Sequence, residues 1–351
     1  MLHQDTTMFL IICSAMVLFM TPGLAFFYGG LVRASSVVSM MMMSFGSLAL
    51  ISVLWVAIGY AMSFGAAGTG NFIGIDGVFG IDLDKLFLAD VIEQAKNGDG
   101  FGLAFAGFQG TFAIITVALI SGAIADRARF GSWMIFGAIW AVIVYFPVAS
   151  WIFNFTVEDG KVIDGGWLVY NIGVLDFAGG TVVEIASGAS ALALALVVGK
   201  RFGFTKGMHA PHNVPLTLIG AAILWFGWFG FNAGSQLAAD GVAALAFVNT
   251  LAAPVGAMLS WVAYEQIVHK KPTSVGAASG AVSGLVAITP SCAFLDPIFA
   301  LLLGAIVGVV CALAIELKYI LGFDDSLDVV GIHLVGGLVG TIYIGFFGKG
   351  V

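Results

Sequence analysis

Residues 101–125 read FGLAFAGFQGTFAIITVALISGAIA, a stretch of 25 residues without a charged side chain. A helix needs about 20 apolar residues to cross the roughly 30 Å hydrocarbon core of a bilayer. Strands of a membrane barrel instead alternate apolar and polar side chains over about ten residues. This unbroken apolar stretch therefore predicts a membrane-spanning helix.

The rest of the chain has the same apolar character. Of its 351 residues, 60% are hydrophobic and only 9% are charged, whereas a soluble domain carries about 25% charged residues. The formal net charge is −7 and no basic stripe occurs, which excludes a nucleic-acid-binding protein. The sequence also lacks the phosphate-binding glycine loop and the HExxH and GxSxG motifs of ATPases and hydrolases. We therefore predict an all-α integral membrane protein that is not an enzyme.

Polar residues divide the sequence into ten apolar segments, and we predict that each forms a membrane-spanning helix. Together they make a single polytopic membrane domain over residues 1–351, with a first half at about 8–199 and a second half at about 214–347. The predicted segments are 8–31, 37–64, 101–125, 130–153, 167–199, 214–236, 242–264, 274–294, 297–317 and 329–347.

The positive charges indicate which way the chain is inserted. With the N-terminus outside, the inward loops hold nine Lys and Arg residues and the outward side holds four, and cytoplasmic loops usually carry the excess. We therefore predict a multi-pass protein of the cell membrane with its N-terminus outside. The inward residues are Arg33, Arg127, Arg129, Lys200, Arg201, Lys206, Lys270, Lys271 and Lys318, and the outward residues are Lys85, Lys96, Lys161 and Lys349.

One spacing of eight residues between ionisable side chains occurs twice. Asp176 precedes Glu184 in DFAGGTVVE, and Asp325 precedes His333 in DSLDVVGIH. With five segments in each half, the second half would insert upside down relative to the first. Inverted repeats of this kind place a substrate path near the midplane, where the halves meet. The spacing favours an inverted five-plus-five repeat.

Asp176, Glu184 and His333 are the ionisable residues that lie within or at the edge of the predicted segments. Ionisable side chains inside a membrane are costly and usually face the bundle interior or a pathway. Glu184 and His333 therefore either join two helices through a hydrogen bond or take part in conduction, and we favour conduction. Asp176 is followed by Gly179 and Gly180, and we expect it to cap a helix or support a loop.

The stretch LWFGWFGFNAGSQ (224–236) gathers aromatic side chains, Asn232 and Ser235 at one end of a segment. Aromatic faces and a hydroxyl acceptor can hold a small cation, although core packing is the simpler explanation for the stretch by itself. The three cysteines lie in apolar stretches, and no Cys-x-x-Cys pair occurs. We therefore expect no disulfide framework, metal site or cofactor.

Eight stretches of the sequence resemble the Amt/Mep/Rh ammonium transporters, and they occur in the family's order over nearly the whole chain. The resemblance implies an ammonium transporter that forms a homotrimer, with one pore per subunit and an inverted repeat of five plus five helices. The stretches are TPGLAFFYGGLVR (21–33), FAGFQGTFAIIT (105–116), LDFAGGTVVE (175–184), KRFGF (200–204), PHNVPLTLIGAAILWFGWFGFNAGS (211–235), AALAFVNT (243–250), SGAVSGLVAITP (279–290) and DDSLDVVGIH (324–333).

The resemblance implies a role for each matching residue. Phe112 and Phe231 match the stacked aromatic gate over the pore, and Ser235 matches the hydroxyl of the outer recruitment site. His333 matches the second member of the family's pore histidine pair. Asp176 matches the family's aspartate near the outer vestibule, where its role is a supporting one.

The sequence departs from the family's pattern at three places. Glu184 stands where the first pore histidine usually lies, which is similar to some fungal members. Phe153 stands where the outer site usually has a tryptophan, and phenylalanine is a weaker cation–π partner. The family's eleventh helix and cytoplasmic tail have no counterpart before Val351, so we expect the chain to be cut short.

The resemblance also implies a mechanism. Ammonium is recruited at the outer aromatic site and loses a proton, and ammonia and the proton then pass separately, guided by Glu184 and His333. The implied substrate-binding residues are Phe112, Phe153, Phe231 and Ser235.

The implied partners are ammonium or ammonia, with methylammonium as an analogue, the lipid bilayer and, by family resemblance only, a cytoplasmic regulatory protein of the PII type. Two other functions stay open, namely a membrane sensor that binds ammonium without substantial flux and a structural membrane subunit. Related receptors carry a fused signalling domain, which this sequence lacks.

Overall fold

The computed structural model describes residues 4–65, 71–158, 161–204 and 210–349. In these ranges nine helices are long and apolar enough to cross a membrane, and a shorter apolar helix lies between the seventh and the eighth of them. These ten helices match the ten predicted segments in order, which confirms the all-α membrane fold. Lys206, one of the predicted inward charges, lies outside the described residues.

The first half of the chain contains α1 to α8 and two short β-hairpins, which lie in connections between spans. A π-helical turn joins α2 to α3, and a second one joins α6 to α7, so that each of these pairs makes one continuous span. The elements are α1 (Gln4–Leu31), α2 (Val37–Leu54), α3 (Tyr60–Ser63), β1 (Phe72–Ile75), β2 (Phe79–Asp82), α4 (Ala89–Lys96), α5 (Phe101–Ile120), α6 (Phe130–Trp140), α7 (Phe146–Phe153), β3 (Phe155–Glu158), β4 (Lys161–Gly165) and α8 (Ala186–Val198).

The second half contains α9 to α14. The last two of these helices are separated by the connection that follows Leu321, and α14 is preceded by a π-helical turn. The elements are α9 (Val214–Gly234), α10 (Gly241–Val268), α11 (Ser274–Ile288), α12 (Pro297–Ala314), α13 (Leu317–Leu321) and α14 (Val335–Phe347).

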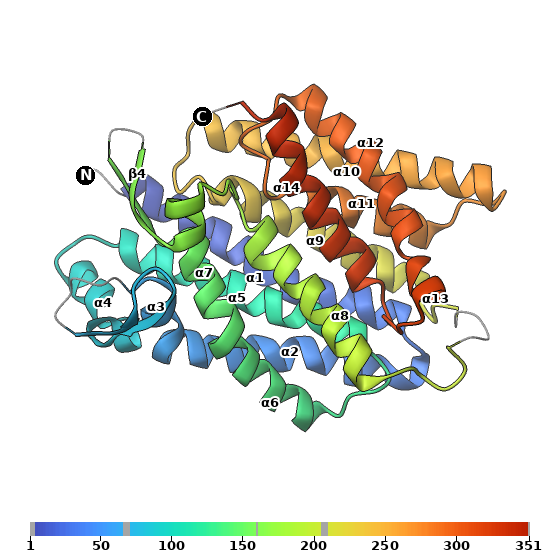
Figure 1. Ribbon diagram of the computed structural model, residues 1–351, viewed down its shortest axis with the longest axis horizontal. Coiled ribbons are helices and arrows are strands. Elements are labelled where there is room, and N and C mark those ends of the chain that lie inside the picture. The colour runs from blue at the N-terminus through green and yellow to red at the C-terminus, as the bar shows by residue number, and fades with distance from the viewer. Residues whose placement is uncertain (1–3, 66–70, 159–160, 205–209, 350–351) are drawn as a thin grey trace.

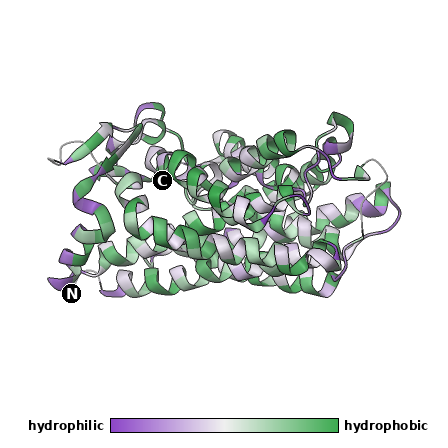
Figure 2. Ribbon diagram, turned by 90° about the horizontal axis from the view of Figure 1, so that it is seen from below, coloured by the Kyte–Doolittle hydropathy of each residue, from purple (hydrophilic) through white to green (hydrophobic). Residues whose placement is uncertain are grey.

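The long helices pack side by side, roughly along the longest axis of the molecule (Figure 1). Both chain ends, β4 and α4 lie toward one end of the bundle, which we call the N-terminal end, and α13 lies toward the opposite end. An even number of crossings returns the chain to the side on which it began, as seen here. Hydrophobic residues fill the length of the bundle, and hydrophilic residues gather toward its two ends (Figure 2).

The predicted span over 167–199 is wrong at its start. The chain turns at Gly173 and Gly179, whose φ angles are 76° and 110°, and the membrane helix begins only at Gly180. Glycine adopts this left-handed backbone without the steric cost that other residues meet. Glu184 is therefore only the fifth residue of its helix, where the apolar run had predicted a position well inside one.

The predicted span over 274–294 also contains a shorter helix. It ends at Ile288, and the chain turns from there to Phe294. A proline disfavours helical backbone at the residue before it, which accounts for an end close to Pro290. The carbonyl of Pro290 accepts the N–H of Phe177 at 3.1 Å, so this turn packs against the loop before α8.

The spans over residues 180–198 and 330–347, which contain α8 and α14, run in opposite directions (Figure 1) and pack closely near their starts. A Cβ atom at Gly188 would collide with the backbone of Leu334, and a Cβ atom at Gly337 would lie 3.1 Å from that of Glu184. Small residues allow membrane helices to approach backbone to backbone in this way. This packing brings the starts of the two spans together.

Candidate functional site

Glu184 and His333 meet in the π-helical turns that precede α8 and α14, Gly180–Ile185 and Val330–Leu334. Oε2 of Glu184 lies 2.5 Å from Nδ1 of His333, and both side chains are buried. So short a contact requires a shared proton between the two atoms. Within the part of the chain that the structure describes, Oε1 of Glu184 has no hydrogen-bond partner. The structure thus brings the two predicted pore residues together and leaves one carboxylate oxygen able to bind a donor.

Asp176 caps the helix that carries Glu184. Its carboxylate accepts four consecutive backbone N–H groups at 2.6–3.4 Å, which otherwise have no partner at a helix start. The donors are Gly179, Gly180, Thr181 and Val182. This geometry fits the capping role expected from the sequence, because Asp176 fixes the turn from which Glu184 projects.

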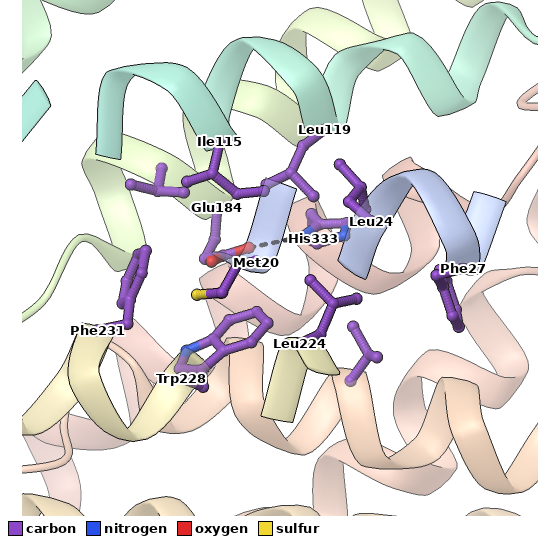
Figure 3. A pocket seen from close by; sticks show the side chains of 12 residues that line it. Met20, Leu24, Phe27, Ile115, Leu119, Glu184, Leu224, Trp228, Phe231 and His333 are labelled. Atoms are coloured by element: carbon purple, nitrogen blue, oxygen red, sulfur yellow. Dashed lines mark hydrogen bonds and ion pairs between the residues drawn. The ribbon is translucent and has the colours of Figure 1, made fainter. Parts of the chain in front are cut away.

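A small cavity lies beside the Glu184–His333 pair (Figure 3). It has room for about one molecule of the size of water or ammonia. The other side chains that line it are aliphatic, aromatic or thioether groups. Phe231 lies at one end of the cavity and Phe27 at the other, with Trp228 between them (Figure 3). The acid and the imidazole are therefore the polar groups of an otherwise apolar chamber.

Two stacked phenylalanine rings close the cavity toward the N-terminal end. The ring centroids of Phe112 and Phe231 are 4.1 Å apart, and their planes differ by 28°. The edge of Phe108 packs on Phe112 at 4.8 Å. All three rings are buried. A molecule that entered the cavity from this side would have to part the two stacked rings.

Phe153 and Ser235 lie beside the stacked rings, and both side chains are partly exposed. Phe153 meets Phe112 edge to face, at 6.4 Å between centroids and 86° between planes. The Ser235 hydroxyl donates to the carbonyl of Phe231 at 2.8 Å, which leaves its oxygen lone pairs available to a donor. The four predicted substrate-binding residues therefore form one contiguous group.

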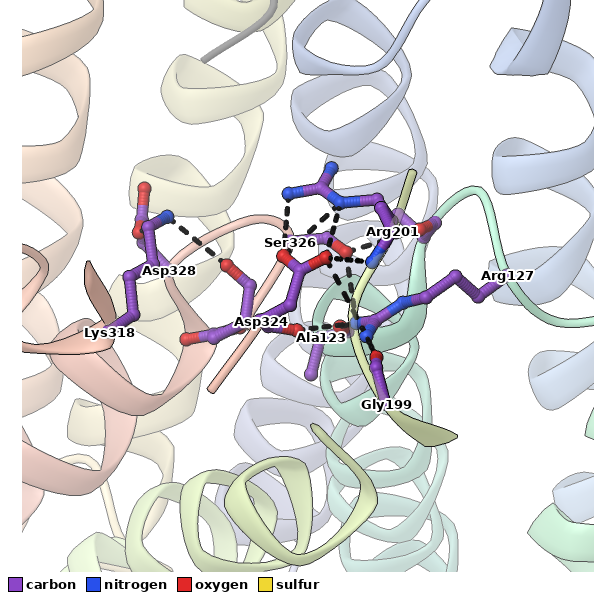
Figure 4. Close-up of polar contacts among 10 residues, drawn as sticks. Ala123, Arg127, Gly199, Arg201, Lys318, Asp324, Ser326 and Asp328 are labelled. Carbon is purple, nitrogen blue, oxygen red and sulfur yellow. Dashed lines mark hydrogen bonds and ion pairs between the residues drawn. The ribbon is translucent and has the colours of Figure 1, made fainter. Parts of the chain in front are cut away.

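A buried ionic network ties three connections together at the opposite end of the bundle (Figure 4). Arg127 donates to the backbone carbonyls of Gly199 and Asp324 and to the hydroxyl of Ser326. Arg201 donates to both carboxylate oxygens of Asp324 at 2.8–3.2 Å. Burial alone would raise the pKa of Asp324, but the hydrogen bonds and charge of Arg201 outweigh it and hold that pKa below its usual value.

Over residues 8–351 the sequence matches the profile described as the Ammonium Transporter Family. The chain belongs to this family. Its members are membrane transporters and not a class of enzymes. The apolar helices of the bundle are those expected of a membrane transporter. The family match also agrees with the resemblance found in the sequence.

Individual members of the ammonium transporter family match the chain over nearly its full length. The ammonium transporter of Mycobacterium tuberculosis (strain H37Rv) is 50% identical over 349 residues, which cover 97% of this chain and 72% of that protein. The crystal structure of Saccharomyces cerevisiae Mep2 matches with a TM-score of 0.86 at 34% identity, covering 98% of this chain and 74% of that one. A structure described as Sensor Amt Protein matches with a TM-score of 0.88 at 28% identity, covering 98% and 83%.

The apolar walls of the cavity are the part of this transporter's site that the sequence analysis missed. Three helices each contribute residues from one face, at spacings of three or four. These helices are apolar on every side, so no contrast marks the face that lines the cavity. The missed residues are Met20, Leu24 and Phe27 in α1, Ile115 and Leu119 in α5, and Leu224 and Trp228 in α9.

Proposed function

We propose that this chain is an ammonium transporter that moves ammonia and a proton separately along the Glu184–His333 pair. The observation that carries the proposal is Oε1 of Glu184, a buried acceptor beside the cavity that is unpaired among the described residues. An N–H of ammonia or ammonium can satisfy this oxygen, whereas an apolar molecule cannot. The relatives named ammonium transporters support this choice of substrate.

Desolvation explains why the ion gives up its proton. An isolated ion that leaves water for an apolar medium loses tens of kcal/mol of solvation free energy by Born estimates. Neutral ammonia avoids this cost and is small enough for the cavity. The released proton binds the Glu184–His333 pair, whose side chains are joined by a hydrogen bond. Sodium and potassium have no proton to release, so the same cavity excludes them.

Recruitment of the ion precedes this step. Phe112, Phe153 and Phe231 offer aromatic faces and edges, and Ser235 offers lone pairs, next to the stacked rings. A cation near an aromatic face gains about 0.5–1 kcal/mol at an exposed site. The site therefore concentrates ammonium weakly and releases it readily toward the cavity.

The membrane setting follows from the same reasoning. We infer that the N-terminal end of the bundle faces outward in the cell membrane, because the excess of Lys and Arg falls on the opposite side. We further infer a homotrimer with one pore per subunit, on the strength of the family resemblance. Size-exclusion chromatography with light scattering in detergent tests the trimer.

Current recordings from proteoliposomes under an ammonium gradient test the function. We expect an ammonium-dependent current that methylammonium competes for, and much smaller currents with sodium or potassium. Equal currents with all of these cations would contradict the proposal.

A second candidate function is an ammonium sensor, which the likeness to the structure described as Sensor Amt Protein favours. A sensor needs to bind the ion but does not need to move it. Saturable binding of methylammonium together with no measurable current would support the sensor and reject the transporter.

A further inference from the structure

Asp176 and Asp325 stand at equivalent positions, eight residues before Glu184 and His333. Each accepts backbone N–H groups at the start of the helix that carries its pore residue, but the two carboxylates differ in how fully they are used. The four N–H groups on Asp176 engage both of its oxygens. Oδ2 of Asp325 accepts the N–H of Val330 at 2.7 Å, while its Oδ1 has no partner within the described ranges.

The unpaired oxygen of Asp325 lies in a charged and enclosed setting. The side chain is 1% exposed. The charged and titratable groups around it are Asp328, Lys318 of α13, Arg127 before α6 and Tyr28 of α1. Lys318 Nζ lies 2.5 Å from Oδ1 of Asp328 (Figure 4). It also lies 3.1 Å from the backbone carbonyl of Asp325. The ammonium group of Lys318 thus pairs with Asp328 and leaves the carboxylate of Asp325 without a direct ionic partner.

This setting favours the protonated form of Asp325. Burial is the main reason why the pKa of Asp325 is raised from 3.8 to about 6, and the negative charge of Asp328 acts in the same direction. Lys318 and the backbone N–H of Val330 act in the opposite direction and are outweighed. Asp325 therefore exchanges a proton close to neutral pH.

Tyr28 lies near the cavity and near the connection that contains Asp325. Its hydroxyl donates to the carbonyl of Leu119 at 2.9 Å, and the side chain of Leu119 lines the cavity. Tyr28 also interacts electrostatically with both Asp325 and Glu184. Asp325 caps the first turn of the helix that carries His333, about one turn away along the axis. The carboxyl group thus lies between the Glu184–His333 pair and the end of the bundle that holds α13 (Figure 1).

We propose that Asp325 is a proton-binding site at the inner end of the transport path, which takes up the proton after it leaves the Glu184–His333 pair. An O–H bond forms at Oδ1 of Asp325 as an O–H bond of a hydronium ion breaks, which leaves a neutral water molecule. Release to the inner solution restores the carboxylate, and no electron is transferred. This inference rests on the proposed transport function and its orientation.

The test is a pH titration of the purified full chain by infrared difference spectroscopy, which detects the carbonyl stretch of protonated carboxylic acids. We expect a component with a midpoint near pH 6 that is lost in Asp325→Asn. Asparagine keeps the helix cap, since it caps as well as aspartate does. The matched control is Asp240→Asn, at an exposed cap of α10 whose pKa is lowered by the N–H of Ala243, and it should keep the component. Identical spectra of the parent and Asp325→Asn would overturn the proposal.

Flux measurements complete the test and separate it from the transport function. With the inner pH varied across about 5 to 7.5 and the outer pH held fixed, Asp325→Asn should lose the part of the pH dependence that lies near pH 6. An unchanged dependence on inner pH would overturn the proposal even if Asp325 titrates. Absence of ammonium current in the parent chain would instead reject the proposed transport function.

A second variant covers the case in which Asp325→Asn does not fold. Asp328→Asn removes the neighbouring negative charge and keeps Asp325, so the infrared midpoint should move to lower pH. A midpoint that stays in place would count against Asp325 as its source.

Discussion

The side chains of Glu184 and His333 meet at 2.5 Å although 149 residues separate them in the chain. Glu184 is the fifth residue of its helix and His333 the fourth of its own, and the two helices run in opposite directions (Figure 1). A shift of either helix along its axis would therefore change the length of this contact. The pair couples the geometry of the two halves to the chemistry of the cavity.

Glu184→Gln separates a proton-handling role from a helix-joining role. Glutamine keeps the shape and one hydrogen bond but cannot ionise, so we expect flux per folded protein to fall or to lose its pH dependence. The measurement is ammonium flux from about pH 5 to about pH 8, normalised to the assembled protein recovered by size-exclusion chromatography. A variant that matches the parent across this range would show that Glu184 only joins the helices.

Glu184→His is the matched variant that restores the family's usual pair. Imidazole titrates nearer neutrality than an unperturbed carboxyl group does. We therefore expect transport to persist with its pH profile shifted. Loss of all flux from a well-folded variant would contradict the equivalence of the two residues at this position.

Phe153→Trp is expected to strengthen recruitment of the ion. Phe153 meets Phe112 at 6.4 Å, and indole is the better cation–π partner, so the gain should be about 0.5–1 kcal/mol, or roughly twofold to fivefold in half-saturation concentration. Competition between ammonium and methylammonium measures it. Phe155→Trp, on the neighbouring strand β3, is the control and should leave the value unchanged. An equal change in both variants would mean that Phe153 does not face the ion.

Gly188→Ala should disturb the helix crossing. The added methyl group would collide with the backbone of Leu334, next to His333. We therefore expect the free energy of unfolding to fall by about 1–3 kcal/mol, with a lower melting temperature and reduced flux. Gly107→Ala is the control, because nothing among the described residues lies within 4 Å of the added carbon. Equal melting temperatures of the two variants would argue against close packing at the crossing.

Asp325→Asn should also change how stability depends on pH. The pKa of Asp325 rises from 3.8 to about 6 on folding, so the folded state holds this proton to higher pH than the unfolded state does. The resulting stabilisation is largest in acid and is lost as the pH rises through about 6, by at most about 3 kcal/mol. The variant lacks this loss, so its melting temperature relative to the parent should increase between about pH 4 and about pH 6, where the two states differ in bound protons, and stay constant above that range. A constant difference between the two curves would contradict the shift.

The apolar runs were sufficient to predict the fold class and the number of membrane helices, because a bilayer requires long uninterrupted apolar segments. They could not predict where two helices begin and end. Gly179 and Pro290 interrupt helices inside apolar sequence, and hydropathy does not register a change of backbone direction. The few polar residues near them, such as Asp176 and Thr289, do not break the apolar runs.

The ionisable and aromatic residues of the site were predictable for different reasons. Glu184 and His333 stood out from the residues alone, because charge is rare inside apolar segments. Phe112, Phe231 and Phe153 were assigned through the family resemblance, since single aromatic residues do not stand out among 30 phenylalanines. The unpaired oxygen of Asp325 could not be predicted from the sequence, because its hydrogen-bond partners depend on how the connections fold over it.

The contacts of Arg127 have a consequence for biosynthesis. Arg127 bonds to Asp324, a residue made 197 positions later. At about 5–20 residues per second, a nascent chain would carry Arg127 for roughly 10–40 s before Asp324 is made. We therefore expect the first half to remain loosely assembled in the membrane until the last connection emerges from the ribosome. Force measurements on stalled nascent chains should then record an increase in pulling force once residue 324 reaches the membrane. This increase should be smaller in Arg127→Ala.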